Sequence, residues 1–119
     1  MKDIWVHRGN IFWVDFNFST GSEQAGFRPC VIVSNEIANK HSPTVTAVPL
    51  TTRQKKPLPT HAIIHATGYT STALCEQVLS VSKERLQNYI GSCTEQEMRD
   101  IDDCLLAQLG LQQNNFKPY

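Results

Sequence analysis

Short apolar stretches, separated by polar segments, run along most of this chain and predict a mainly β structure. The stretches rich in β-branched, aromatic and other apolar side chains are residues 11–16, 30–33, 44–50, 61–65 and 73–81. The apolar run from Cys30 to Val33 is continuous and predicts a central strand that is buried on both faces. Pro49 cannot donate to a strand ladder, so an edge or a bulge is expected there. Glu76 and Gln77 interrupt the last stretch.

Helical signals appear in three places. Asn35 is placed to cap a single helical turn, and Ser82 is placed to cap a short helix over residues 83–89. Near the end of the chain, Thr94 and Glu97 have the spacing of a capping box. The apolar side chains that follow at helical spacing, and that we expect to pack on the core, are Met98, Ile101, Leu105 and Leu109. The whole pattern predicts about five to seven short strands in a bent antiparallel sheet or partial barrel, with the C-terminal helix packed against it.

Length and composition indicate one domain that spans residues 1–119, with a frayed polar tail over residues 112–119. The sequence has no apolar run near the roughly 18 residues that a membrane helix needs, and its first residues lack the apolar core of a signal peptide. A cytoplasmic protein is therefore expected. The cysteines and histidines show none of the spacings typical of zinc sites, and we expect no metal and no cofactor.

The charges are unevenly distributed along a chain whose formal net charge is zero. Residues 1–60 carry seven basic and four acidic side chains, whereas residues 61–119 carry four basic and seven acidic ones. The first half therefore has a net charge of +3 and the second half has a net charge of −3. A net charge of zero gives the whole protein no electrostatic attraction to nucleic acid. It is still compatible with a local positive face that attracts phosphates.

Two polar loops carry side chains that suit binding. The first spans residues 19–29 between two predicted strands, includes Arg28, and gains backbone freedom from Gly21 and Gly26. The second spans residues 51–60 and combines three cations with two prolines, which stiffen it. From composition alone, each loop fits a binding segment and an ordinary solvated connection about equally well.

Seven segments form a recognisable combination when they are read together: residues 8–16, 21–29, 33–35, 41–44, 49–51, 58–61 and 76–78. In this combination they resemble the MazF/PemK family. The most specific segment is the run Gly-Ser-Glu-Gln-Ala-Gly-Phe-Arg-Pro over residues 21–29. The resemblance extends from about residue 8 to residue 111. The sequence departs from the family pattern at Asn10, where aspartate is usual, and at Ala25, where glycine is common. Neither departure removes a group that the chemistry needs.

The resemblance implies the toxin of a bacterial type II toxin–antitoxin system. Members of this family are metal-independent endoribonucleases that cleave single-stranded messenger RNA at short sequences. The 2′-hydroxyl attacks the phosphate, which leaves a 2′,3′-cyclic phosphate and a 5′-hydroxyl. Family members are homodimers of an SH3-like partial barrel of the MazF/PemK/CcdB type. A cognate antitoxin inhibits them with a disordered segment laid over the RNA groove.

The resemblance assigns catalytic roles to Arg28 and Thr51. In this reaction the 2′-hydroxyl loses a proton, the phosphorane gains negative charge and the 5′-oxygen gains a proton. Arg28 suits charge stabilisation because its planar fork donates two hydrogen bonds to phosphate oxygens. Thr51 does not titrate usefully, so its hydroxyl suits positioning of the phosphate. The general base is unassigned, with Glu23 as a weak candidate.

Side chains that suit RNA binding lie in both loops and beside them. Aromatic rings stack on bases, polar side chains read base edges and cations hold phosphates. The residues assigned to these roles are Phe18, Ser22, Glu23, Gln24, Phe27, Arg53, Lys55, Lys56 and Gln77. For His41, His61 and His65, a surface or packing role is favoured over catalysis.

Two other functions stay open at this point. Proteins that resemble CcdB share the fold but poison gyrase through protein–protein contact, without chemistry. A barrel of this kind is also able to bind RNA without cutting it. The Arg-Pro element at residues 28–29 and the Pro-Leu-Thr element at residues 49–51 favour the nuclease.

Overall fold

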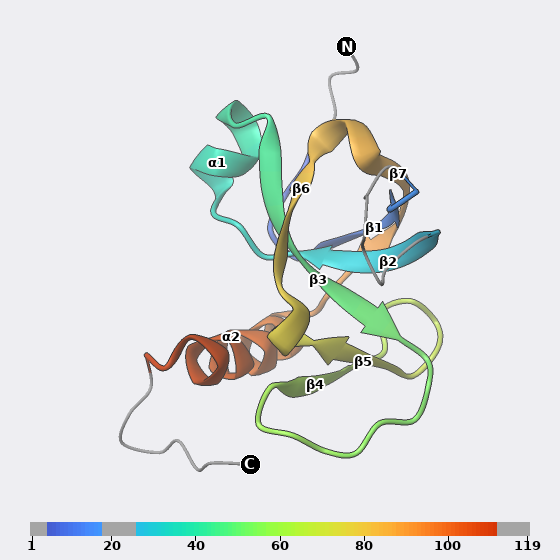
Figure 1. Ribbon diagram of the computed structural model, residues 1–119, viewed down its shortest axis with the longest axis vertical. Coiled ribbons are helices and arrows are strands. Elements are labelled where there is room, and N and C mark those ends of the chain that lie inside the picture. The colour runs from blue at the N-terminus through green and yellow to red at the C-terminus, as the bar shows by residue number, and fades with distance from the viewer. Residues whose placement is uncertain (1–4, 18–25, 112–119) are drawn as a thin grey trace.

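The computed structural model describes residues 5–17 and 26–111 and contains an antiparallel sheet with a long C-terminal helix (Figure 1). Its elements, with η for a 3₁₀ turn, are β1 (Asn10–Asp15), β2 (Phe27–Ile32), α1 (Glu36–His41), β3 (Thr44–Thr51), β4 (His61–Ile64), β5 (Ser71–Leu74), η1 (Cys75–Gln77), β6 (Leu79–Ser82), η2 (Lys83–Arg85), β7 (Leu86–Ser92) and α2 (Glu95–Leu109). The predicted mainly β fold with a C-terminal helix is confirmed. The tail over residues 112–119 lies outside the described residues. Among the described helices, none has the length and apolar character that a membrane crossing requires.

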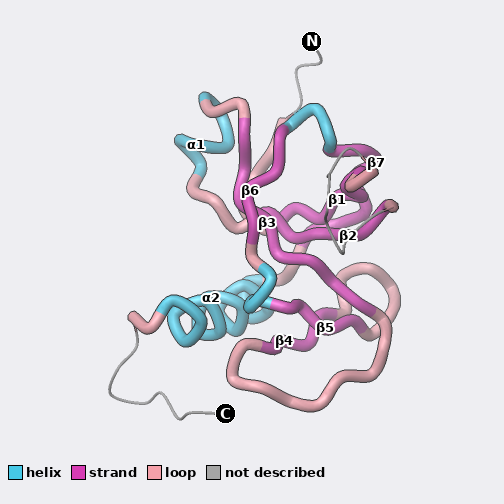
Figure 2. Tube along the Cα trace, viewed as in Figure 1, coloured by secondary structure: helices cyan, strands magenta, loops and turns pink. Residues whose placement is uncertain are grey.

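β3 is the longest of the described strands and joins the two halves of the sheet (Figure 2). The strand order is β4-β5-β3-β2-β1-β7, and β6 pairs with the first half of β3 on the side opposite β2. Residues 44–47 pair with β6, whereas Leu50 and Thr51 pair with β5. Pro49 lies between these two ladders, at the kind of break in strand pairing where proline is tolerated.

Alternate side chains of the central strands enter two apolar clusters on opposite faces of the sheet. Cys30 and Ile32 belong to one cluster, whereas Val31 and Val33 belong to the other. α2 covers the second cluster, to which it contributes the fully buried Ile101. The prediction that the apolar run of β2 is buried on both faces is therefore confirmed.

α2 begins at the predicted capping box. The Glu97 N–H donates to the Thr94 hydroxyl at 3.1 Å, and the Thr94 N–H donates to the Glu97 carboxylate at 2.9 Å. The helix ends at Gly110, whose φ of +70° is the left-handed conformation that favours glycine. The stripe residues that pack on the core are Met98, Ile101 and Leu105. Leu109 is 60% exposed, so the packed stripe is one turn shorter than predicted.

The predicted helix over residues 83–89 is wrong. The Ser82 hydroxyl does accept the Glu84 N–H, but it caps only the 3₁₀ turn η2. From Leu86 onward the chain forms β7, which pairs with β1. Leu86 lies opposite Val14 and is buried, so strand pairing and burial of this side chain outweigh a weak helical pattern.

Two smaller sequence signals are confirmed. The Asn35 side chain accepts the Ala38 N–H and caps α1, as predicted. η1 separates β5 from β6 at the point where Glu76 and Gln77 interrupt the apolar stretch. This turn brings polar side chains to the end of β5.

Candidate functional site

The two predicted catalytic residues lie at adjoining strand ends. β2 and β3 pair antiparallel, and the last paired residues on this side are Cys30 and Pro49. Arg28 lies two residues before Cys30 in β2, and Thr51 lies two residues after Pro49 in β3, so both flank the same end of this ladder. Side chains two residues apart on a strand share a face, so Arg28 and Thr51 lie on the face that also holds Cys30. The fold thus places two residues that are far apart in the sequence at the same end of the β2–β3 ladder.

Arg28 carries a charge that no carboxylate neutralises within residues 5–17 and 26–111. It is half-buried and lies opposite the buried Val14 of β1. Burial raises the pKa of the Cys30 thiol to about 12, and the Arg28 charge opposes this rise. Cys30 is therefore a neutral packing residue and does not compete for the guanidinium.

The Thr51 hydroxyl closes the turn at the end of β3. Its oxygen accepts the Arg53 N–H at 3.2 Å, and the side chain is half-buried. A hydroxyl that accepts one hydrogen bond still has its own proton to donate. The position therefore fixes the Thr51 oxygen while leaving its O–H for a phosphate oxygen.

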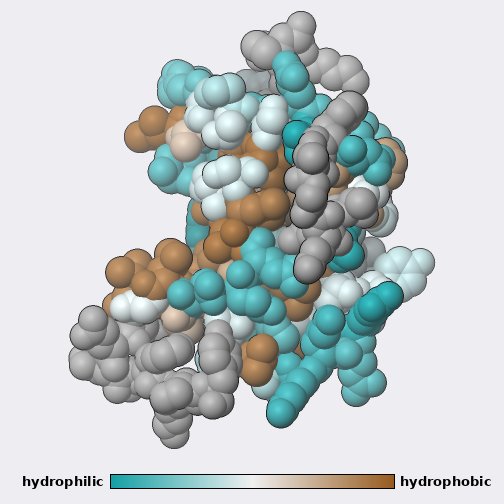
Figure 3. Space-filling model, viewed as in Figure 1, coloured by the Kyte–Doolittle hydropathy of each residue, from teal (hydrophilic) through white to brown (hydrophobic). Residues whose placement is uncertain are grey.

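The segment from residue 52 to residue 60, here called the basic loop, connects β3 to β4. Its cations Arg53, Lys55 and Lys56 are exposed, and Figure 3 shows hydrophilic side chains gathered on this part of the surface. The far end of the loop is anchored, because Thr60 is fully buried and its carbonyl accepts the Cys75 N–H at 3.0 Å. The loop therefore presents its cations to solvent from a fixed end.

The ring of His61, the first residue of β4, links the basic loop to η1. Its Nδ1 lies 3.0 Å from the Lys56 carbonyl oxygen, and its Nε2 lies 2.9 Å from Oε2 of Glu76. The Thr60 hydroxyl donates to Oε1 of Glu76 at 2.9 Å. Burial disfavours the charged form of Glu76, but hydrogen bonds from His61, from the backbone and from Thr60 outweigh burial and lower its pKa. Gln77 follows Glu76 in η1, so this contact joins two predicted RNA-binding segments.

Two aromatic side chains are exposed on the β1–β2 pair, on the face opposite to the one that holds Arg28. Phe27 is 56% exposed and lies opposite Asp15, whereas Trp13 is 40% exposed and lies opposite Pro29. Phe27 and Trp13 are therefore diagonal neighbours on one face of the β1–β2 pair, within reach of a shared ligand. Sequence reasoning missed Trp13 because it lies in a strongly apolar strand. The alternation of side chains along β1 could have identified Trp13. Its neighbours Phe12 and Val14 enter the apolar core, so Trp13 points to the other face of the strand.

Four predicted RNA-binding residues lie outside the described residues, namely Phe18, Ser22, Glu23 and Gln24. The ends of their loop are joined, since the Phe16 N–H donates to the Gly26 carbonyl at 2.8 Å. Gly26 has a φ of +94°, which confirms that the loop uses the backbone freedom of this glycine. The loop therefore leaves and re-enters the sheet beside Phe27 and Arg28.

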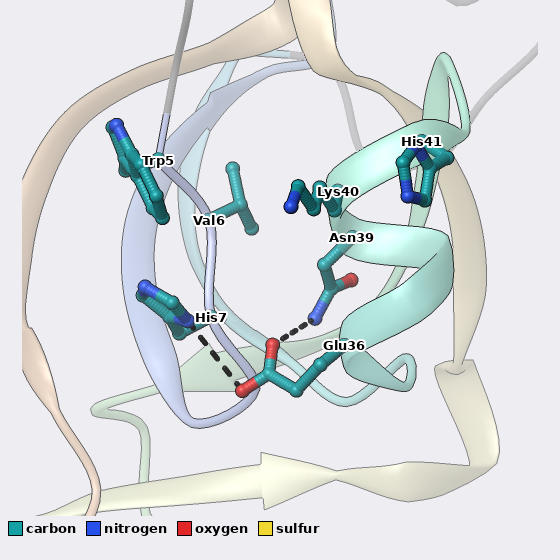
Figure 4. A pocket seen from close by; sticks show the side chains of 7 residues that line it. All are labelled: Trp5, Val6, His7, Glu36, Asn39, Lys40 and His41. Carbon is teal, nitrogen blue, oxygen red and sulfur yellow. Dashed lines mark hydrogen bonds and ion pairs between the residues drawn. The ribbon is translucent and has the colours of Figure 1, made fainter.

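A separate cavity of about 490 Å³ lies between the segment before β1 and α1 (Figure 4). Trp5 stacks on His7 there, and the Glu36 carboxylate accepts hydrogen bonds from Asn39 and from the Arg8 N–H. α1 follows the end of β2, whereas Arg28 lies near its start (Figure 1). The lining residues include His41 and none of the residues assigned to catalysis or RNA binding.

The remaining thiols lie away from Arg28. Cys75 and Cys104 belong to the cluster beneath α2, and a hydrogen bond between them raises the pKa of Cys75 and lowers that of Cys104. Cys75 is fully buried. Within the described part of the chain, no three histidine, cysteine or acidic side chains gather into a metal-binding group.

Comparison with known proteins gives this arrangement a family. A family model described as "PemK-like, MazF-like toxin of type II toxin-antitoxin system" matches residues 7–109. The chain belongs to this family. The matched residues include both loops and the whole of the described sheet, so the resemblance found in the sequence is confirmed.

Solved structures of related proteins have the same fold. An endoribonuclease from mycobacterial species, solved in complex with its cognate antitoxin, is 28% identical with a TM-score of 0.78, over 91% of this chain and 98% of that chain. A second mycobacterial endoribonuclease is 27% identical with a TM-score of 0.75, over 88% and 91% of the two chains. MazF from Deinococcus radiodurans, at 24% identity and a TM-score of 0.77 over 91% and 99%, supports the fold.

Proposed function

We propose that this member of the MazF-like toxin family is a metal-independent endoribonuclease that cleaves single-stranded RNA, including messenger RNA, at a short sequence. The observation that supports the proposal is that Arg28 and Thr51 lie at adjoining ends of the paired strands β2 and β3 in a chain of this family. The exposed basic loop leaves the sheet directly after Thr51, so cations that suit the RNA backbone follow this residue in the chain.

The proposed reaction is an internal transesterification. The 2′-oxygen forms a bond to phosphorus, and the bond between phosphorus and the 5′-oxygen breaks. The products are a 2′,3′-cyclic phosphate and a 5′-hydroxyl. Arg28 stabilises the charge that develops on the phosphorane through two parallel hydrogen bonds, and the Thr51 hydroxyl orients the same phosphate.

Proton transfer needs groups beyond this pair. A guanidinium stays protonated near neutral pH, and a threonine hydroxyl does not titrate there. The base that accepts the 2′-hydroxyl proton is therefore neither Arg28 nor Thr51. Arg28 is suited to donate a strong hydrogen bond to the departing 5′-oxygen, which takes its proton from water.

RNA binding combines two kinds of contact. The basic loop holds phosphates, which gives affinity without sequence information. Phe27 and Trp13 offer exposed rings on which unpaired bases stack. The polar side chains that suit the reading of base edges are those named from the sequence: Ser22, Glu23, Gln24 and Gln77.

The proposed partners are a cognate antitoxin and a second copy of the chain, in the cytoplasm. One similar mycobacterial endoribonuclease was solved with its cognate antitoxin, which supports an antitoxin partner here. A single domain over residues 1–119 fits this assembly, since the family match spans residues 7–109.

The test is cleavage of a long mixed-sequence RNA by the purified protein in excess chelator, with every new end mapped. Recurrent cuts at one short sequence that leave 5′-hydroxyl ends are expected. Arg28→Ala is expected to lower the rate by roughly 100- to 1,000-fold. Arg99→Ala is the control, because Arg99 is exposed on α2 and hydrogen-bonds Gln96.

Three results would count against the proposal. Intact RNA after incubation with a folded protein would exclude the nuclease, and RNA bound without cleavage would identify a binding barrel. Inhibition of gyrase by a protein that leaves RNA intact would identify the CcdB-like function. Full activity of Arg28→Ala would remove Arg28 from the mechanism.

A further inference from the structure

The imidazole ring of His61 faces a hydrogen-bond acceptor on each side. Nδ1 lies 3.0 Å from the carbonyl oxygen of Lys56, and Nε2 lies 2.9 Å from a carboxylate oxygen of Glu76. A carbonyl oxygen and an ionised carboxylate only accept hydrogen bonds. A neutral imidazole carries one N–H, whereas an imidazolium carries two. Only the protonated ring therefore satisfies both contacts.

Glu76 is well placed to hold a cation. Despite the burial that opposes its charge, hydrogen bonds lower its pKa, so the carboxylate stays ionised under conditions that protonate histidine. The His61 side chain is 7% exposed and that of Glu76 is 32% exposed. Water therefore has little access to the ring, and an N–H or acceptor left unpaired there is costly.

The two contacts connect segments that lie far apart in the sequence. On one side is the basic loop, through the Lys56 carbonyl. On the other side is η1, which carries Gln77 and contacts both α2 and β3. The loop is held at its far end by Thr60, but its exposed cations lie before that point. The His61 ring reaches back to this exposed part.

We propose that protonated His61 is a positioning residue that holds the basic loop against η1, so that RNA affinity falls when the ring loses its proton. This inference rests on the proposed RNA-binding function and adds pH control to it. A loop that is already ordered pays less conformational entropy on binding RNA. When only a fraction of molecules has the ordered loop, the measured affinity falls by that fraction.

The other charges around His61 fit this role. β5 places Leu74 opposite His61, so the strand beside it adds no charge at this position. Asp102 of α2 is the carboxylate of that helix whose charge raises the pKa of Cys75 in η1, and it forms an ion pair with Arg8. The loop contributes Lys55 and Lys56, whose side chains are exposed. Glu76 is therefore the carboxylate that faces the His61 ring, at 2.9 Å.

The first test examines the free protein. Nitrogen chemical shifts of the imidazole ring report its protonation, and backbone order parameters of Gln54, Lys55 and Lys56 report loop order. Both are measured at about pH 5.5 and about pH 8, which span the usual range of histidine titration. The expected result is an ordered loop when His61 is charged and a more mobile loop when it is neutral. His61→Gln should give the mobile loop at both pH values.

The second test measures affinity for RNA that resists cleavage because its riboses carry 2′-O-methyl groups. Wild-type affinity is expected to fall by roughly tenfold between the two pH values, the loss of one charge-assisted hydrogen bond. His61→Gln should bind weakly at both pH values. The control is His65→Gln, because His65 lies four residues away and its ring makes one long contact of 3.4 Å, to Thr70. This variant should keep the wild-type pH profile.

Three outcomes would overturn the inference. The first is a basic loop whose order parameters do not change with the charge of His61. The second is a His61 ring that is neutral at about pH 5.5. The third is a His61→Gln variant whose RNA affinity varies with pH as that of wild type does. Loop order that follows His61 in a protein without affinity for RNA would support the positioning role and refute the proposed function, so the two failures are distinguishable.

Discussion

Glu97 holds α2 against the end of β4, and its removal is expected to destabilise the whole fold. Its side chain is buried although it carries a carboxylate. One oxygen accepts the Thr94 N–H at 2.9 Å, which completes the capping box, and the other accepts the His65 N–H at 2.6 Å. A single side chain thus accepts hydrogen bonds from a backbone N–H at the start of α2 and from a backbone N–H directly after β4.

The cost of Glu97→Gln follows from these two bonds. An amide has one acceptor oxygen, so its NH₂ group faces one of the two N–H donors and leaves that donor unpaired. An unpaired buried donor costs about 1–3 kcal/mol. Unfolding entropy of roughly 2.1 cal/mol/K per residue gives about 0.25 kcal/mol/K for a chain of 119 residues. A loss of about 2 kcal/mol therefore lowers Tm by about 8 °C.

The assay is thermal unfolding of wild type, Glu97→Gln and Glu95→Gln at one protein concentration. Glu95 is the matched control, because it is an exposed acid in the same helical turn. Its loss removes only a helix-dipole interaction of about 0.3–1 kcal/mol. The amide resonance of His65 should shift in Glu97→Gln and stay in place in Glu95→Gln. Equal Tm values for the two variants would refute the assignment of this stability to the Glu97 bonds.

Three further predictions concern the candidate site. Thr51→Ala should slow RNA cleavage by roughly 100-fold while the exposed neighbour Thr52→Ala has no effect, as measured by initial rates. Trp13→Ala should weaken RNA binding by about 1–3 kcal/mol in an anisotropy titration, whereas Trp5→Ala, beside the separate cavity, should not. The lowered pKa of Glu76 stabilises the folded state above the unfolded-state pKa, and this stability is lost as the pH falls through the folded-state pKa. Wild type should therefore lose stability more steeply than Glu76→Gln between about pH 5 and about pH 3 in urea unfolding, and parallel curves would contradict this.

The elements that the sequence predicts well are those whose signals are local. The capping box at Thr94 and Glu97 needs only two side chains three residues apart in one turn, and it appears as expected. The run from Cys30 to Val33 is apolar at every position, which suits a strand between two clusters. β7 was missed because its side chains alternate poorly, and its stability comes from pairing with β1, which no local pattern records.

In the candidate site, too, local signals were predicted from the sequence, whereas contacts that depend on strand pairing were not. Arg28 and Thr51 were assigned through family motifs, and their place at the same end of the β2–β3 ladder depends on strand pairing. His61 was interpreted as a surface or packing residue because its strand pattern gives no sign of Glu76, which lies 15 residues later in η1. That contact exists because β4 and β5 form a hairpin that returns the chain to the start of β4.

The shared strand β3 explains why catalysis and RNA affinity should respond to different substitutions. Thr51 lies where β3 pairs with β5, and Arg28 lies in the neighbouring strand, so both are held by strand ends. The basic loop begins where this pairing stops, and His61 is its link back to η1. Substitutions at Arg28 or Thr51 should therefore lower kcat, whereas His61→Gln should raise KM and leave kcat near the wild-type value. A fall in kcat alone for His61→Gln would place the ring in the chemistry and not in the positioning of the loop.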